Sequence, residues 1–325
     1  MTRAGTETDR TWLGPVALLL AAIIWGFVPT STRHVVGTLS GGHILLARFL
    51  VGALAAAIAI WLLHAPIPER RLWPKTIGFG LLGQLGFNVP LAYGIQHVEA
   101  GTAALVSGTS SIFIAVLAAK VLHERVQPRV AVGLLLALVG TVVVSVMSGG
   151  EIGIAGDQAV GVLLVLLSSI LWAIYSVLVK PWIGPIPPTS IPMFGSLAGL
   201  PLMLPLGASG FLAATGELDA ISWLAVAQFS LLASVAAPML WAVGLGRGLA
   251  SRAGLYLYLV PLFGVVASTL LLDEPVGTGT VVGGALILGG VLLATVIPNR
   301  RPQPRVSLDD GTRQEALELS RETLH

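Results

Sequence analysis

The strongest constraint on the fold is a series of long apolar runs separated by short polar segments. A helix needs about 20 apolar residues to cross a bilayer core about 30 Å thick. Of the 325 residues, 55% are hydrophobic and only 10% are charged, and the mean hydropathy is +0.88. A soluble domain carries about 25% charged residues, so the sequence predicts an integral membrane protein. We count ten runs, at 13–32, 43–63, 75–94, 102–121, 128–148, 158–180, 190–207, 221–243, 252–271 and 279–297.

The runs predict helices rather than the strands of a barrel, because their apolar residues are continuous and do not alternate with polar ones. The first run follows Arg3 and Arg10 and could be a secretory signal. Its long apolar stretch, without a convincing small-residue cleavage site, favours a retained span. We expect residues 1–12 to be a cytoplasmic N-terminus and residues 298–325 a disordered cytoplasmic tail.

The basic residues predict the orientation. Cytoplasmic loops of membrane proteins carry an excess of Lys and Arg. With the N-terminus inside, 16 of the 18 Lys and Arg residues fall on the cytoplasmic side, while Arg33 falls outside and Arg48 lies within a span. We therefore expect a multi-pass protein of the bacterial cytoplasmic (inner) membrane with both termini in the cytoplasm.

The chain repeats itself at a distance of 150 residues. The stretch "LHERV" at 122–126 returns as "LDEPV" at 272–276, and eight of the 22 positions from Leu122 to Val143 are identical in the second copy. A fixed internal period is informative about the fold. A shift of 150, or of 147 nearer the N-terminus, aligns Gly133 with Gly283, Gly140 with Gly290, Trp73 with Trp223 and Trp25 with Trp172.

Each half holds five spans, and because five is odd the second half should cross the membrane in the opposite direction. The LHERV stretch, a turn that contains Glu124, would then lie inside, and its LDEPV copy, which contains Glu274, would lie outside. Only the first copy of this Glu turn carries basic residues. The sequence therefore predicts an all-α integral membrane protein of ten transmembrane helices, arranged as two inverted five-helix repeats at 13–148 and 158–297. Such repeats are common in secondary transporters, which bind substrate near the midplane between the halves.

The chain resembles the drug/metabolite transporter superfamily, in its EamA-like branch of ten-helix bacterial permeases. The resemblance covers about residues 13–297. It rests on the two five-helix halves, a Trp near the start of each, "ARF" at 47–49, and the Glu turn followed by a Gly-rich span. The family often has Pro in the span before the Glu turn; the second half has Pro261, but the first has Ser111. The resemblance implies alternating access to a cavity between the halves, without fixing one substrate.

Polar side chains within the spans are the first candidates for substrate binding. Arg48 could bind an anionic group such as a carboxylate, or could extend to the membrane surface. Gln84 and Asn88 share one face of the third span, and Ser107 and Ser111 share one face of the fourth. These four side chains could bind polar groups of a substrate or form interhelical hydrogen bonds.

Aromatic side chains near the middles of spans are the second group of candidates. Interfacial belts place Trp and Tyr at the ends of spans, whereas Trp25, Trp172, Tyr175 and Trp241 lie near the middle, and Tyr256 is a weaker candidate. They could form a cavity wall that packs flat or cationic substrates, or pack between helices. The repeat relation between Trp25 and Trp172 favours the cavity.

Glu124 and Glu274 stand just before the fifth and tenth spans. An anion near a helix N-terminus is stabilising, so we interpret both as structural turns, with a gating or proton role as the alternative.

Motifs for other classes of protein are lacking. The stretch "GFGLLG" at 78–83 matches a dinucleotide fingerprint but lies within a span, and we find no zinc helix, nucleophile elbow or phosphate loop. We expect no catalytic residue, metal, cofactor or nucleic-acid partner. All acidic residues fall in loops, turns or tails, which favours facilitated diffusion or exchange over a buried acid relay.

The function predicted from these features is secondary transport of small metabolites or drugs by alternating access. We expect an exporter, in the bilayer as a monomer or homodimer. An uptake permease of the same fold is the alternative within this class. A membrane-embedded enzyme or a non-transporting receptor is the alternative outside it.

Overall fold

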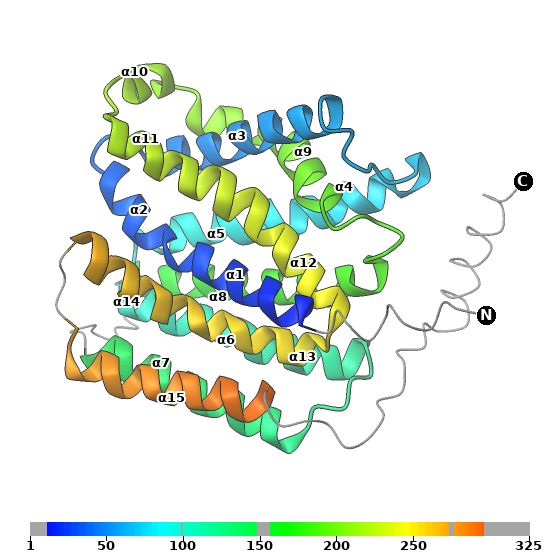
Figure 1. Ribbon diagram of the computed structural model, residues 1–325. Helices are drawn as coiled ribbons and strands as arrows, with labels where there is room; N and C mark the ends of the chain where they lie inside the picture. The colour runs from blue at the N-terminus through cyan, green and yellow to red at the C-terminus, as the bar shows by residue number, and fades with distance from the viewer. Residues whose placement is uncertain (1–11, 99, 148–156, 273–275, 296–325) are drawn as a thin grey trace, which may run out of the picture.

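The computed structural model describes residues 12–98, 100–147, 157–272 and 276–295. Within these residues the regular elements are all helices, and they run side by side as one bundle (Figure 1). The prediction of an all-helical membrane protein is confirmed. Nine helical stretches of the described chain are long and apolar enough to span a membrane: Leu13–Val35, Gly41–Trp61, Thr102–Val121, Pro128–Met147, Gln158–Trp182, Ser190–Gly207, Ala220–Arg247, Ala250–Leu271 and Thr278–Thr295.

We group the α-helices by the two residue ranges that the sequence predicts as repeats, 13–148 and 158–297. The first half contains α1 (Leu13–Gly26), α2 (Val28–Val35), α3 (Gly41–Trp61), α4 (Trp73–Leu81), α5 (Phe87–Gly94), α6 (Ala100–Val121) and α7 (Pro128–Met147). The second half contains α8 (Asp157–Val179), α9 (Ser190–Gly207), α10 (Phe211–Gly216), α11 (Ala220–Ala227), α12 (Ala237–Arg247), α13 (Ala250–Ala253), α14 (Leu259–Leu272) and α15 (Thr278–Thr295).

Several of the expected spans are interrupted helices. Pro29 lies in the first turn of α2, where its missing N–H is tolerated, and α1 ends just before it at Gly26. The third expected span continues from α4 through a π-helical segment, η3 (Leu82–Gly86), into α5. The eighth has a longer π-helical segment, η5 (Gln228–Ala236), between α11 and α12. Such π segments are often found at functional sites.

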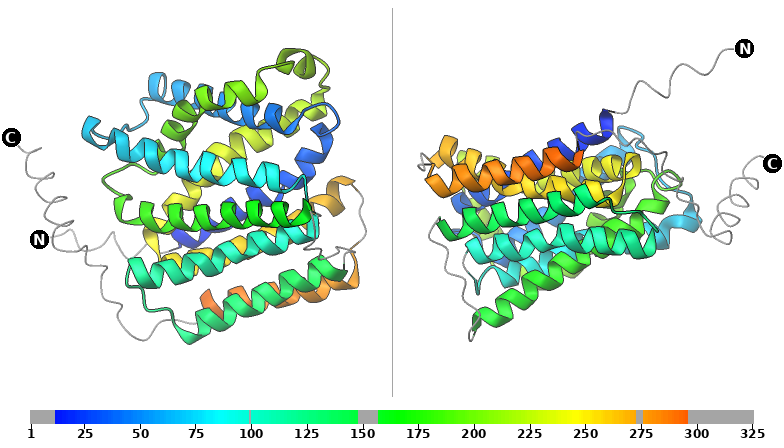
Figure 2. Two further views of the ribbon diagram at one scale, coloured as in Figure 1. Left: turned by 180° about the vertical axis from the view of Figure 1, so that it is seen from behind. Right: turned by 90° about the horizontal axis from the view of Figure 1, so that it is seen from below.

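Glycine allows α7 and α15 to pack closely. Figures 1 and 2 show α7 and α15 side by side at one edge of the bundle. A Cβ atom on Gly140 would lie 2.6 Å from the Gly283 carbonyl oxygen, and one on Gly133 would lie 2.6 Å from that of Gly290. The backbones therefore touch at two crossings, as is typical of small residues in membrane interfaces.

Candidate functional site

Five aromatic rings from four helices meet in the bundle. Trp172 of α8 lies at their centre, with ring centroids 5.4 Å from Trp25, 5.1 Å from Phe87, 5.1 Å from Tyr175 and 5.7 Å from Trp241. Trp25 and Trp241 are themselves 5.9 Å apart. These separations and the tilted or edge-on ring planes are those that aromatic pairs prefer. We call these five residues the aromatic cluster; it brings together four of the side chains predicted from the sequence.

Hydrogen bonds fix two of the indole rings. Trp25 Nε1 donates to the Ala233 carbonyl at 3.0 Å, within η5. Trp241 Nε1 donates to Ser176 Oγ at 3.2 Å. Both partners belong to other helices, so the rings tie α1 and α12 to neighbouring segments while their apolar faces remain in the cluster.

A polar cluster forms around Ser234 of η5. The side chain of Arg48 points into the bundle, and its Nε donates to Ser234 Oγ at 2.8 Å. Gln84 Nε2 donates to the Ser234 carbonyl at 2.7 Å, and Asn88 Nδ2 donates to the Gln84 carbonyl at 2.6 Å. Ser234 Oγ in turn donates to the Phe229 carbonyl at 2.8 Å. Two side chains predicted from the sequence, those of Arg48 and Gln84, therefore meet at one serine that was not predicted, and Asn88 lies one turn beyond Gln84.

Two groups of this polar cluster keep unused hydrogen-bonding capacity. Arg48 is only partly buried, and its hydrogen bond uses Nε alone; none of the described acidic residues forms an ion pair with it. Asn88 is buried, and its Oδ1 has no hydrogen-bond partner among the described residues. A guanidinium with free N–H groups is suited to binding a carboxylate in the planar, two-point geometry.

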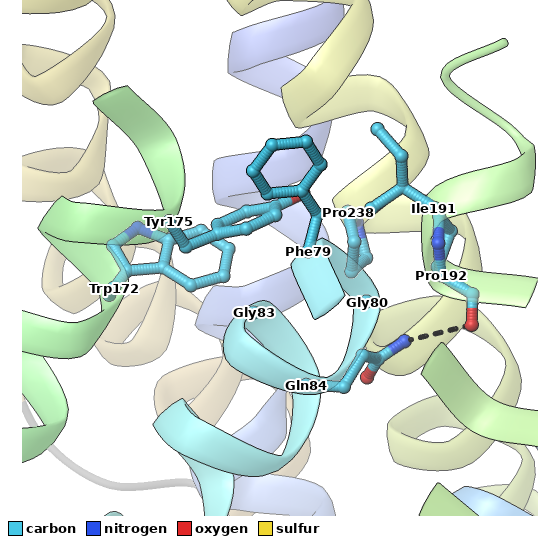
Figure 3. Close-up of a pocket in the computed structure, with 9 residues that line it drawn as sticks. All are labelled: Phe79, Gly80, Gly83, Gln84, Trp172, Tyr175, Ile191, Pro192 and Pro238. Carbon is cyan, nitrogen blue, oxygen red and sulfur yellow. Dashed lines mark hydrogen bonds between the residues drawn. The ribbon is translucent and has the colours of Figure 1, made fainter. Parts of the chain in front are cut away.

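A small pocket adjoins both clusters (Figure 3). Gln84 lines it from the polar side and Trp172 and Tyr175 from the aromatic side, with Phe79 and Pro192 among the other lining residues. Its cavity volume is about 10 Å³. Ligand pockets usually measure about 300–1,000 Å³, so side chains fill the space that a substrate would need in this conformation.

The remaining in-span candidates lie outside these clusters. Ser111 is fully buried, and its Oγ donates to the Gly254 carbonyl at 2.7 Å, so it forms an interhelical hydrogen bond. Ser107 is half-buried and makes no side-chain hydrogen bond within the described chain. Tyr256 packs against the core that holds the rings but makes no ring contact with them in the described part.

We expected Glu124 to stabilise the start of α7, the helix that follows it, but its carboxylate lies at the start of another helix, α13. The backbone reverses at His123, whose φ is +53°, and the Glu124 N–H donates to the Ala118 carbonyl at the end of α6. The carboxylate therefore reaches the start of α13, where it accepts from the N–H groups of Ala250 at 2.8 Å and Ser251 at 3.1 Å. Glu274 lies outside the described residues.

The Glu124 carboxylate is also paired with Lys180. Lys180 Nζ lies 2.5 Å from Oε1, and Ser251 Oγ donates to Oε2 at 3.0 Å. Burial would raise the pKa of Glu124, but the Lys180 ammonium and the hydrogen bonds from Lys180, Ala250 and Ser251 outweigh it and hold that pKa below its ordinary value. The carboxylate is therefore charged at neutral pH, although only 5% of the residue surface is exposed.

The described residues contain no group of three or more His, Cys, Asp or Glu that could hold a metal ion.

The fold and the two clusters define a multi-pass helical membrane protein with a polar and aromatic centre. The chain belongs to the EamA-like transporter family, whose model matches residues 12–146 and 159–296. These segments cover the two halves described above.

Curated relatives of full length are named as transporters. An uncharacterized transporter of Archaeoglobus fulgidus is 27% identical over 86% of this chain and 97% of its own. A probable terminal-alkyne amino-acid exporter of Streptantibioticus cattleyicolor is 28% identical over 85% and 91%. The aromatic amino acid exporter YddG of Ancylobacter novellus is 27% identical over 91% and 100%. A solved crystal structure with a TM-score of 0.72 shares the fold at 23% identity and covers 90% of this chain and 98% of its own.

Proposed function

We propose that this protein is a secondary transporter that exports small carboxylate-bearing metabolites, amino acids foremost, across the bacterial cytoplasmic membrane. The observation that carries the proposal is Arg48: a guanidinium within a span, held by a neutral serine, without an acidic partner in the described chain. Two relatives named as amino-acid exporters support this substrate class.

In this proposal the two clusters bind opposite ends of one molecule. The guanidinium of Arg48 holds the carboxylate, while the amides of Gln84 and Asn88 bind neighbouring polar groups. The aromatic cluster packs the apolar part of the substrate. Because the present pocket is small, we infer that a substrate enters only when the rings and the helices that carry them separate.

Alternating access would follow from an inverted repeat, and contacts between repeat-related residues support that architecture. Gln84 donates to Ser234, the residue 150 positions later. Trp25 contacts Trp172, its partner at a shift of 147. If two halves are related by a two-fold axis in the membrane plane, equivalent residues meet where their helices cross that axis.

Contacts in two further helix pairs fit the same two-fold axis. In α6, a Cβ atom on Gly108 would lie 3.3 Å from the ring of Tyr258, which stands 150 positions later. The glycine contacts of α7 and α15 pair Gly133 with Gly290 and Gly140 with Gly283. At a shift of 150 Gly133 corresponds to Gly283 and Gly140 to Gly290, so each contact becomes the other when the halves are exchanged. We infer a two-fold relation between the halves, with Trp73–Gly94 as the tenth span.

Counterflow in proteoliposomes tests the proposed function. Vesicles loaded with an unlabelled amino acid should accumulate a labelled one, whereas loading with an amino-acid amide, a sugar or a cationic drug should give weak or no exchange. Exchange of the cation with none of the carboxylates would overturn the substrate class. No exchange of any compound by folded protein would count against transport. Direction, and with it the uptake alternative, follows from comparing efflux with uptake in cells.

A further inference from the structure

The buried carboxylate of Glu124 connects the two halves of the molecule at one end. Glu124 follows α6, in the first half. Its partners Lys180, Ala250 and Ser251 all belong to the second half. Removing one partner of a buried ion pair strongly destabilises the conformation that contains it, because the other charge stays buried without a partner.

A second contact joins the halves beside this ion pair. The Lys75 ammonium lies over the ring of Trp182, 3.7 Å from its centroid. Lys75 stands at the start of α4 in the first half, and Trp182 is two residues beyond Lys180. The segment that follows α8 is therefore held from two sides by residues of the other half.

The ion pair lies at the end of a helix face that leads to the aromatic cluster. Lys180, Ser176 and Trp172 are spaced four residues apart, so they follow one another along the same face of α8 and its extension. Ser176 accepts from Trp241, and Trp172 is the central ring. If Lys180 moved away from Glu124, this face of α8 would become accessible to solvent, beginning at the Lys180 end.

We propose that Glu124 is the latch that holds this end of the transporter closed in the conformation described. The proposal deepens, and rests on, the alternating access proposed above. The latch comprises the Glu124 carboxylate, Lys180, and the Ala250 and Ser251 groups that bond to it. Opening toward this side, which the basic residues identify as cytoplasmic, requires all four bonds to break. Glu124 is thus a residue that sets the balance between conformations, and it does not itself contact the substrate.

Thiol labelling tests the latch directly, since the chain contains no cysteine. A single Ser176→Cys substitution introduces a probe at a position that is fully buried here, one turn from Lys180. A membrane-impermeant sulfonated maleimide is added to inverted and to right-side-out vesicles. With Glu124 present, labelling from the Lys180 side should be slow. Glu124→Gln should raise its rate at least about tenfold, since losing a buried charge partner shifts the population toward the open form.

Matched variants make the result specific. Glu69→Gln removes the acid of another ion pair, Glu69–Arg71, whose side chains are 50% and 34% exposed, and it should leave the labelling rate unchanged. Lys180→Gln should raise the labelling rate as Glu124→Gln does. If Glu124→Gln does not fold, Lys180→Gln is used in its place. Glu124→Asp keeps the charge, so its labelling rate should lie between that of the parent and that of Glu124→Gln.

Equal labelling of the parent, Glu124→Gln and Lys180→Gln in folded protein would overturn the latch, as would an equal increase in Glu69→Gln. The assay needs no substrate, so its failure is distinct from failure of the proposed function. Transport with unaltered labelling removes only the latch, whereas faster labelling without any counterflow removes only the transport proposal.

Discussion

Arg48 illustrates how the surroundings of one residue decide its role. On insertion scales an arginine at the centre of a span costs about 2.5–3.5 kcal/mol. Such a cost is usually reduced by an acidic partner or by extension of the side chain to the membrane surface. The side chain instead points into the bundle and bonds to a neutral hydroxyl, so a substrate anion is the partner that we infer.

Replacing Arg48 tests this inference at the scale of one side chain. Arg48→Gln should abolish counterflow of amino acids, because the amide can still bond to Ser234 but carries no charge. Arg48→Lys should retain a small part of the activity, because an ammonium keeps the charge and loses the two-point geometry. Thermal unfolding of both variants should match that of the parent. Unchanged transport kinetics in Arg48→Gln would remove this residue from the site.

At this scale the sequence predicted side chains better than their partners. Trp25, Trp172 and Trp241 could be singled out because aromatic residues in the middle of a span are uncommon. Phe87 and Ser234 could not, because phenylalanine and serine are frequent in apolar helices and neither has an unusual position. Glu124 was assigned to the wrong helix, since chain proximity suggested α7 whereas the fold brings α13 closer.

At the scale of elements, the crossings of α7 and α15 depend on the absence of side chains. A Cβ atom at Gly140 would meet the Gly283 carbonyl at 2.6 Å and Ile287 Cγ1 at 2.8 Å. Neither neighbour can yield easily, because one is backbone and the other is a buried side chain. The seven-residue spacing of the glycines in each of these helices places them on one helix face, which suits close helix packing, although it does not identify the partner helix.

Gly140→Val should therefore destabilise the protein by about 1–3 kcal/mol, the usual effect of overpacking. Gly78→Val is the matched control, because a Cβ atom on this exposed α4 glycine would have no neighbour within 4 Å. Thermal unfolding in detergent measures both variants. Equal midpoints for Gly140→Val and the parent would show that α7 and α15 can separate without cost.

The π segments could not be predicted from the sequence. Nothing in the letters of Leu82–Gly86 or Gln228–Ala236 distinguishes a π turn from an α turn, and the structure shows that both bear residues of the polar cluster. A π segment has i→i+5 hydrogen bonds, and the Gln84 side chain of one π segment donates to the Ser234 carbonyl of the other at 2.7 Å. The sequence predicted the helices, whereas their local winding depends on tertiary packing.

At the scale of the whole molecule, the number of spans determines where the ends of the chain lie. Nine stretches satisfy the length and apolarity of a span within the described residues, and Trp73–Gly94, with its two amides, is the tenth that we propose. An even number places the termini on the same side of the membrane and an odd number on opposite sides.

Reporter fusions decide between these counts. We expect a fluorescent protein that matures only in the cytoplasm to be bright at either terminus, and alkaline phosphatase, active only outside, to be inactive at both. The excess of Lys and Arg on one side supports this arrangement. Fluorescence at one terminus together with phosphatase activity at the other would show that Trp73–Gly94 does not cross the membrane.

The position of Arg48 has a consequence for how a substrate would be carried. At the shift of 147 that relates Trp25 to Trp172, Arg48 corresponds to Gly195, which packs backbone to backbone against Gly80. The repeat-related position therefore carries no charge. If the halves move as proposed and Arg48 binds the carboxylate, that carboxylate should stay bound to the first half during transport, and the substrate should be released in the orientation in which it was bound.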